Sequence, residues 1–471
     1  MSPNQRLTRR QAIAGLAAAP VLFLDRHGFR SEAPSRPNIV FIMADDLGYA
    51  DLSCYGRPDF KTPNIDKLAA EGMKFTQAYA NSAVCSATRT ALITGRYQYR
   101  LPIGLEEPLA GPKYKVGLSP QHPTLPSLLK KAGYGTTLVG KWHLGYLPDY
   151  GPLQSGYEHF YGFRGGAVDY FTHREGAEST SSEDLWDQDA PVHQAGYLTG
   201  LLGDRAVSVV QGYARERRPF FLSLHFNAPH WPWVGPEDEA ESKRISSLRD
   251  YDGGSQATYA RMVEAMDQQV GRVVDALAAA KLAENTIVIF TSDNGGERFA
   301  DTWPFTGKKS ELLEGGLRIP AIVRWEGHVL PGRVSDQVMI TMDWMPTVLE
   351  AAGIQPDAAF PSDGMSLLSA LAGHVPPVPR KLYWRFHANA QRAMRDGDMK
   401  WLKIRENTFL FNVVSDPLER ANLKERQPEV YKRLVVEYDA WNRTMLPENP
   451  SSYSEKINGK QWADHYGIDP D

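Results

Sequence analysis

Apolar runs alternate with amphipathic stretches along most of the chain. Short runs without polar interruptions predict strands buried on both faces, at Asn38–Met43, Gly135–Gly140, Pro219–Phe226, Thr286–Thr291 and Ile319–Trp325. Stretches with a helical period predict helices at Thr62–Met73, Thr124–Ala132, Gly196–Arg215 and Gln256–Ala280. Strands that alternate with helices predict an α/β fold, in which helices cover a mostly parallel sheet.

The pattern changes beyond the proline-rich stretch at 375–380. Short runs predict strands at Lys381–Phe386, Gln391–Arg395, Met399–Arg405 and Thr408–Asn412, and a closing amphipathic helix at Glu429–Met445. We expect a small antiparallel sheet with one helix, packed on the large domain. The predicted division is therefore a leader at 1–35, a large domain at 36–375, a C-terminal α+β subdomain at 380–446 and a tail at 447–471.

The first 35 residues have the layout of an export signal. Arg6, Arg9 and Arg10 precede an alanine-rich apolar run at 12–24, and residues 8–11 resemble a twin-arginine signal. The alternative is an untargeted amphipathic extension. We expect export to the periplasm or the cell exterior, with cleavage after Ala19 or nearer Ala33.

Composition narrows the function classes. The 471 residues are 42% hydrophobic and carry a net charge of -4, which is typical of a globular chain with one large and one small domain. No basic domain stands out, so no nucleic-acid partner is expected. No apolar run is long enough for a mature membrane span, so no stable membrane insertion is expected. Cys54 and Cys85 allow at most one disulfide.

The stretch 81–96 predicts a loop that enters a short helix ended by Gly95. Cys85 then lies at the helix N-terminus, where backbone N–H groups favour an anion, and Arg89 lies one turn further along the same side. Alone, this spacing also fits an inert buried cysteine beside a surface arginine.

Polar side chains follow four of the predicted strands. They are Asp45 and Asp46, Lys141 and His143, His230, and Asp293 and Asn294. Ligands of open α/β sheets bind beyond the carboxyl ends of the strands, so we expect these side chains to converge. The carboxylate and amide oxygens suit Ca²⁺ or Mg²⁺ rather than Zn²⁺. Each aspartate taken alone could instead be a helix cap or a turn residue, and the histidines and lysines could be structural or solvated.

Several segments together resemble the blocks of the type I sulfatases, with features of arylsulfatases and N-acetylgalactosamine sulfatases. The signature is Cys85-Ser86-Ala87-Thr88-Arg89 with Leu92, Thr94 and Gly95. The other blocks follow in the family's order at 45–48, 140–143, 229–232, 292–295 and 309–320, and the resemblance runs from about Pro37 to Leu446. Ala87 departs from the proline that is commonest in the family.

The resemblance implies a fold, a cofactor and a set of roles. The fold would be an alkaline-phosphatase-like sandwich, and a formylglycine-generating enzyme would oxidise Cys85 to formylglycine, whose hydrate attacks the sulfate ester. Ca²⁺, preferred over Mg²⁺, would be held by Asp45, Asp46, Cys85, Asp293 and Asn294. Arg89 and Lys141 would hold the hydrate, and His143 would take the proton from its second hydroxyl. The substrate would be bound by Lys141, His230 and Lys309. His230 and Lys309 would also protonate the leaving oxygen, with Lys309 preferred to Lys308 by its spacing to Glu314.

The expected activity is hydrolysis of an aryl sulfate or a sulfated carbohydrate. Candidates for lining a substrate cleft are Asp169, His173, Trp186, Trp231, Trp233, Trp303 and His387. Two alternatives stay open: a phosphate or phosphonate monoester hydrolase of the same superfamily, and a non-catalytic binder of sulfated glycans.

Overall fold

The computed structural model describes residues 36–111, 115–175, 182–245, 253–373 and 376–455, which belong to one compact unit beginning at Arg36. The predicted export signal lies outside the described residues. Within these ranges, no helix is both long and apolar enough to cross a membrane.

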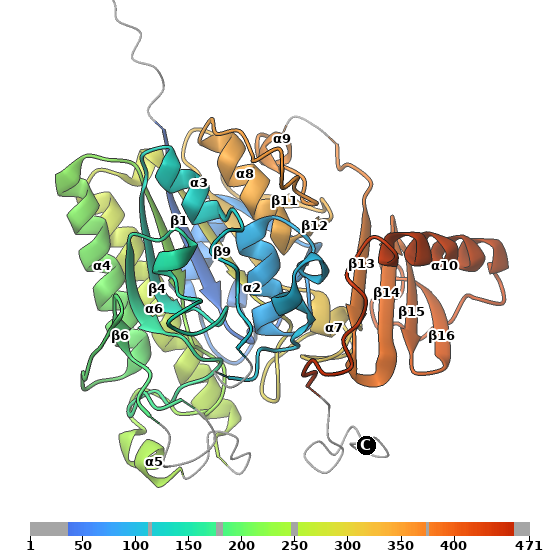
Figure 1. Ribbon diagram of the computed structural model, residues 1–471, viewed down its shortest axis with the longest axis horizontal. Coiled ribbons are helices and arrows are strands. Elements are labelled where there is room, and N and C mark those ends of the chain that lie inside the picture. Colours follow the sequence, from blue (N-terminus) through green and yellow to red (C-terminus); the bar gives the residue numbers. More distant parts are fainter. Residues whose placement is uncertain (1–35, 112–114, 176–181, 246–252, 374–375, 456–471) are drawn as a thin grey trace, which may run out of the picture. The chain divides into compact units, whose positions relative to one another are not determined.

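A 10-stranded sheet forms the centre, in the order β11-β2-β10-β9-β1-β8-β4-β5-β6-β7 (Figure 1). Its strands are β1 (Asn38–Ala44), β2 (Met73–Phe75), β4 (Gly135–Lys141), β5 (His159–Phe163), β6 (Trp186–Asp187), β7 (Ala190–Pro191), β8 (Phe220–His225), β9 (Thr286–Ser292), β10 (Ala321–Arg324) and β11 (Arg333–Ser335). The run from β9 to β5 is parallel, whereas β10, β6 and β7 pair antiparallel with their neighbours. The α/β class and the mostly parallel sheet are therefore confirmed.

Helices cover both faces of this sheet (Figure 1). Alternate residues of β1 point to opposite faces: Phe41 joins one apolar core and Ile42 the other. The core of Ile42 is closed by α1 (Pro63–Ala70), α4 (Leu198–Glu216) and α6 (Gln256–Ala279), and that of Phe41 by α2 (Cys85–Thr94), α3 (Leu125–Lys131) and α8 (Trp344–Ala351). Burial on both faces explains why the central strands carry no polar alternation.

Some elements differ from the sequence-based expectation. The helix predicted over Thr62–Met73 ends at Ala70, and Met73 begins β2 instead. The chain leaves the helix there to pair with β10, and a Cβ at Gly72 would lie 2.1 Å from the carbonyl oxygen of Val323, so a glycine is needed for this close approach. The strands β5, β6, β7 and β11 were also not predicted. Shorter elements are β3 (Ala78–Tyr79), β12 (Met339–Ile340), α5 (Glu239–Arg244), α7 (Glu314–Leu317) and α9 (Leu368–Leu371).

The C-terminal part is an antiparallel sheet of four strands with one helix, as predicted. It comprises β13 (Lys381–Phe386), β14 (Gln391–Asp396), β15 (Met399–Ile404), β16 (Asn407–Asn412) and α10 (Pro428–Asn442). Its apolar side shares a core with Val84, the residue that precedes Cys85. Lys400 of β15 is fully buried and bonds two buried carboxylates, Glu314 of α7 at 3.0 Å and Glu419 at 2.9 Å. The small sheet therefore supports both the loop that enters α2 and the short helix α7.

Candidate active site

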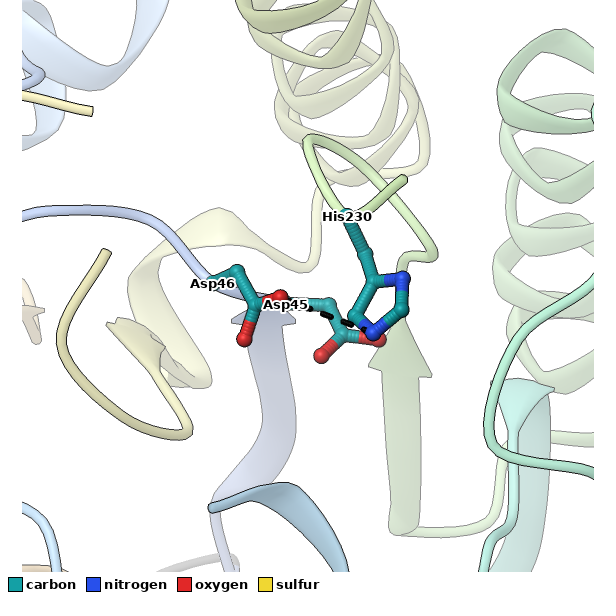
Figure 2. A group of neighbouring side chains, drawn as sticks. All are labelled: Asp45, Asp46 and His230. Carbon is teal, nitrogen blue, oxygen red and sulfur yellow. Dashed lines mark ion pairs between the residues drawn. The ribbon is translucent and has the colours of Figure 1, made fainter. Parts of the chain in front are cut away.

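The four strands that deliver the predicted site residues are direct neighbours. Because β9, β1, β8 and β4 are adjacent and parallel, their carboxyl ends meet at one edge of the sheet. Figure 2 shows Asp45 and Asp46 just beyond β1, facing His230 on the loop after β8. The expected convergence of these side chains is present in the structure.

Three carboxylates and three cations make up the floor of the site. Lys141 Nζ lies 2.5 Å from Asp45 Oδ2. Lys309 Nζ donates to Asp46 Oδ2 at 2.8 Å, and the Arg89 guanidinium donates to Asp293 Oδ2 at 2.9 Å. All six side chains are buried, so these charges hold one another with little solvent screening.

Two buried oxygens of this floor lack hydrogen-bond partners within the part of the chain that the structure describes: Asp45 Oδ1 and Asn294 Oδ1. One ligand atom from each of Asp45, Cys85 and Asp293 lies within 4.8 Å of the others, as does a second group formed by Asp45, Asp46 and His230. Burial raises the pKa of Asp45, and the neighbouring Asp293 raises it further. Unpartnered oxygens amid crowded carboxylates are the donor set that a hard divalent cation satisfies.

Cys85 is the first residue of α2, and local contacts hold it there. The Thr88 hydroxyl accepts from the Ser82 amide and donates to the Ser82 carbonyl, both at 3.0 Å, which closes the loop before the helix. Gly95 ends the helix with a φ of 65°. The predicted loop and helix are thus present, and the thiol points into the charged floor.

His143 faces Cys85 with an acceptor nitrogen. Its Nε2 lies 2.9 Å from the carbonyl oxygen of Leu109, which can only accept, so Nε2 carries the hydrogen. Nδ1 therefore presents a lone pair to Cys85 Sγ at 3.3 Å. Burial lowers the pKa of His143 well below its usual value, and Lys141 lowers it further, so the ring is a neutral base.

Lys309 and His230 form the other side of the site. Because His230 Nδ1 lies 2.7 Å from the carbonyl oxygen of Trp231, Nδ1 carries the hydrogen and Nε2 accepts from Lys309 Nζ at 3.2 Å. Burial would lower the pKa of Lys309, but Asp46 and nearby glutamates outweigh it and raise that pKa well above its usual value. Lys309 is therefore a fixed positive charge at this side of the site.

Strained backbone accompanies the site. Asp46, His143 and Ser310 adopt φ values of 63°, 55° and 69°, in the left-handed region that residues with a Cβ seldom adopt. Such strain costs about 1–3 kcal/mol per residue and is concentrated at functional sites. At His143, just after β4, this backbone accompanies the contact of the imidazole with Cys85.

Sequence reasoning missed His225, which supports Arg89 from behind. Its Nδ1 lies 3.3 Å from the Arg89 guanidinium, and burial, assisted by Arg89, lowers the pKa of His225 to about 3. The neutral ring therefore adds no charge beside Arg89. Its place as the last residue of β8, on the edge where the other site residues lie, was the available signal.

A pocket opens above Cys85 and is lined by residues from distant segments. Besides Cys85, His143, His230, Trp231 and Lys309, its walls include Leu109, Tyr146, Glu175, Tyr453 and Glu455. Of the predicted cleft residues, Trp231 lines this pocket, whereas His387 lines a separate hollow beside residues 450–454.

The other predicted cleft residues do not line this pocket. Asp169 accepts hydrogen bonds from the amides of Phe171 and Thr172 in a turn. His173 is buried, with Nε2 3.1 Å from the Gly196 carbonyl oxygen. Trp186 bonds Asp184 and stacks on Arg164, Trp233 packs on Phe299, and Trp303 is 66% exposed on the surface. Trp186 and Trp233 thus pack against other side chains of the protein, and a sequence pattern alone does not distinguish such packing from contact with a ligand.

Comparison with known proteins agrees with this geometry. A family model described as Sulfatase matches residues 37–354. The chain belongs to the sulfatase family. N-acetylgalactosamine-6-sulfatase of Sus scrofa is 35% identical over 361 residues, which cover 72% of this chain and 66% of the relative. Arylsulfatase A of Homo sapiens is 33% identical over 365 residues, covering 72% of this chain and 68% of the relative.

Solved structures extend the likeness over nearly the whole chain. The crystal structure of Ps i-CgsB in complex with k-i-k-neocarrahexaose has a TM-score of 0.80 and 30% identity, covering 91% of this chain and 97% of that one. The sheet, its helical layers and the small C-terminal sheet of this sulfatase are thus the alkaline-phosphatase-like architecture.

Proposed function

We propose that this sulfatase hydrolyses sulfate esters of sugars or aryl alcohols, with residue 85 acting as a formylglycine hydrate beside a bound Ca²⁺. The observation that carries the proposal is the position of Cys85. It lies at a helix N-terminus, between an oxygen-rich charged floor and the lone pair of a neutral histidine.

An unmodified thiol suits this site poorly. Burial raises the pKa of Cys85 to about 11, so a thiolate would be scarce at neutral pH. A sulfated thiol would also have no internal route for releasing sulfate. An aldehyde hydrate solves both problems, because one hydroxyl attacks sulfur and the second, on losing its proton, expels sulfate and restores the aldehyde. This requires a formylglycine-generating enzyme as a partner during maturation.

His143 is placed to take that second proton. Its Nδ1 is an acceptor 3.3 Å from the Sγ of residue 85, and the Leu109 carbonyl keeps the ring in the required tautomer. Arg89 and Lys141 place positive charge beside the nucleophile and favour its ionised form.

Asp45, Asp46, Asp293 and Asn294, with one oxygen of modified residue 85, would hold the cation. The two unpartnered oxygens supply free ligand atoms for a divalent ion. The three carboxylates of the floor are already balanced by three cationic side chains, so a bound divalent ion would add net positive charge for an anionic substrate. Bound Ca²⁺ would neutralise charge on the nucleophile and on the sulfate group. Mg²⁺ is less suited, because its octahedral shell at short distances tolerates a crowded carboxylate set poorly.

Lys309 and His230 would bind the sulfate ester and assist the departing oxygen. Lys309 supplies a fixed charge, and its ammonium, 3.2 Å from His230 Nε2, has further N–H groups that would donate hydrogen bonds to the departing oxygen. Arginine-rich leader residues outside the described part support export to the periplasm or the cell exterior. The names of the relatives, an N-acetylgalactosamine-6-sulfatase and an arylsulfatase, support sulfated sugars and aryl sulfates as the substrate classes.

Paired esters test the proposal. Protein co-expressed with a formylglycine-generating enzyme should hydrolyse an aryl sulfate and a sulfated monosaccharide much faster than the matched aryl phosphate. Cys85→Ala should abolish turnover, and Cys54→Ala, which alters the other cysteine, should retain it. A strong preference for phosphate, or unchanged turnover by Cys85→Ala, would overturn the proposal, and absence of any turnover would favour a non-catalytic binder.

A further inference from the structure

The last described segment of the chain forms part of the active-site wall. We call residues 449–455 the strap. The Glu107 amide donates to the Tyr453 carbonyl at 2.8 Å, and the Glu455 amide donates to the Glu107 carbonyl at 2.6 Å. Tyr453 and Glu455 line the same pocket as Cys85 and His143. A segment far from the signature in sequence therefore reaches the reacting residues.

The strap places a carboxylate beside the substrate-binding lysine. Glu455 Oε2 accepts from the Ser310 hydroxyl at 3.1 Å, and Ser310 directly follows Lys309. The Ser310 amide in turn donates at 2.9 Å to the carbonyl of Ala83, in the loop before Cys85. Glu455 is thus fixed at the rim of the reaction centre by contacts that leave the Lys309–Asp46 pair intact.

A second carboxylate lines the pocket from another part of the fold. Glu175 Oε1 accepts a hydrogen bond from the Tyr146 hydroxyl, and both residues are pocket-lining. Its amide donates to the Ser182 carbonyl, which holds the backbone in place. The pocket therefore combines two anchored carboxyl groups with the apolar surfaces of Leu109 and Trp231.

We propose that Glu455 and Glu175 make this pocket selective for sugars whose sulfate ester is flanked by free hydroxyls, and that they reject sugars bearing a second sulfate there. Carboxylates accept hydrogen bonds from hydroxyl groups, and an indole beside them matches the apolar face of a sugar ring. A second anionic group in the same low-dielectric pocket meets the like charge of Glu455. Burial and the neighbouring Asp184 raise the pKa of Glu175 to about 7, so Glu175 adds its full charge only above that pH. This inference rests on the proposed sulfatase function and specifies which esters that site accepts.

The test compares substrates that differ by one sulfate. The wild type, Glu455→Gln and Glu175→Gln are assayed with N-acetylgalactosamine 6-sulfate, N-acetylgalactosamine 4,6-disulfate and an aryl sulfate. Glutamine keeps an acceptor oxygen but removes the charge. At a pH of about 8.5, where Glu175 is ionised, we expect the wild type to prefer the monosulfate, and each variant to raise the disulfate-to-monosulfate ratio of kcat/KM by about tenfold. The control is Glu448→Gln, which alters another carboxylate of the tail. Glu448 pairs with Arg392 and does not line the pocket, so this variant should leave the ratio unchanged.

The outcomes separate the two proposals. If the wild type hydrolyses sulfate esters but the ratio does not move in the variants, or if it accepts the aryl sulfate and neither sugar, the selectivity inference is wrong and the sulfatase function stands. Equal loss on every substrate would also overturn it, because that pattern indicates support of Lys309 rather than selection. If the wild type hydrolyses no sulfate ester, the proposed function itself fails.

Discussion

Attachment of the strap should depend on pH through Glu107. This side chain is 3% exposed, and its Oε2 accepts from the His387 amide at 2.7 Å and from the Ser454 hydroxyl at 2.9 Å. Burial raises the pKa of Glu107 to about 8 from a usual 4.5, despite the lowering effect of those two donors. Glu107 therefore joins the pocket loop, the strap and the small sheet through a carboxyl that stays protonated at neutral pH.

The direction and size of this pH effect follow from the difference in the pKa of Glu107 between the attached and the detached strap. Between pH 4.5 and 8 the attached strap keeps this proton, whereas a detached strap exposes Glu107 and releases it. The stabilisation of the attached strap by protonated Glu107 is therefore complete below pH 4.5 and is lost as the pH rises to about 8. At about 1.4 kcal/mol per pH unit, the free energy of opening should fall by up to about 5 kcal/mol across this range.

Native-state hydrogen exchange of the strap amides measures that free energy directly. After correction for the intrinsic pH dependence of exchange, the wild type should lose protection of the Glu455 amide between pH 5 and 8. Glu107→Gln should hold it nearly constant, and the control Glu429→Gln, which removes an exposed carboxylate of α10, should behave as the wild type. Equal pH dependence in wild type and Glu107→Gln would refute the assignment to Glu107.

Three further predictions concern the supports of the site. Lys400→Met should lower the free energy of unfolding by about 3–5 kcal/mol, because it removes a buried ion pair from Glu419 and another from Glu314, which keeps only its pair with Arg318. Lys403→Met on the same strand should cost under about 1 kcal/mol, and similar thermal shifts for both variants would contradict this. Arg89→Lys should lower kcat at least about 100-fold with the melting temperature nearly unchanged, because an ammonium cannot reproduce the two guanidinium contacts to Asp293, and near-normal kcat would refute that role. Removing Ca²⁺ with a chelator should lower both activity and melting temperature, and Ca²⁺ added back at 100 times its Kd should restore about 2.7 kcal/mol of the free energy of unfolding. Asn294→Ala should raise the Ca²⁺ concentration required for this recovery, and a melting temperature that does not change with chelator would exclude a resident ion.

The sequence was most informative where burial is uniform. Strands β1, β8 and β9 are predictable because strands covered on both faces are apolar throughout. The three-residue strand β2 was missed, because its position depends on contact with β10 that no local pattern records. Short edge strands such as β11 share this problem, since their pairing is set by tertiary contact.

The floor of the site was predictable for a related reason. Parallel strands deliver their following residues to one edge, so Asp45, Lys141 and Asp293 converge once the strands are recognised. The pocket walls were not predictable in this way. Leu109, Glu175 and Glu455 come from loops and the tail, and long-range hydrogen bonds to His143, Tyr146 and Ser310 hold them at the pocket.

The central claim is that the working form of residue 85 is an aldehyde hydrate. Peptide mass spectrometry over Asn81–Arg89 of an active preparation tests it directly. The account predicts the mass in which the CH₂–SH of Cys85 has become an aldehyde, in a fraction that rises in proportion to specific activity. Full sulfatase activity from protein whose residue 85 is wholly unmodified cysteine, or a Cys54–Cys85 disulfide in the active material, would contradict it.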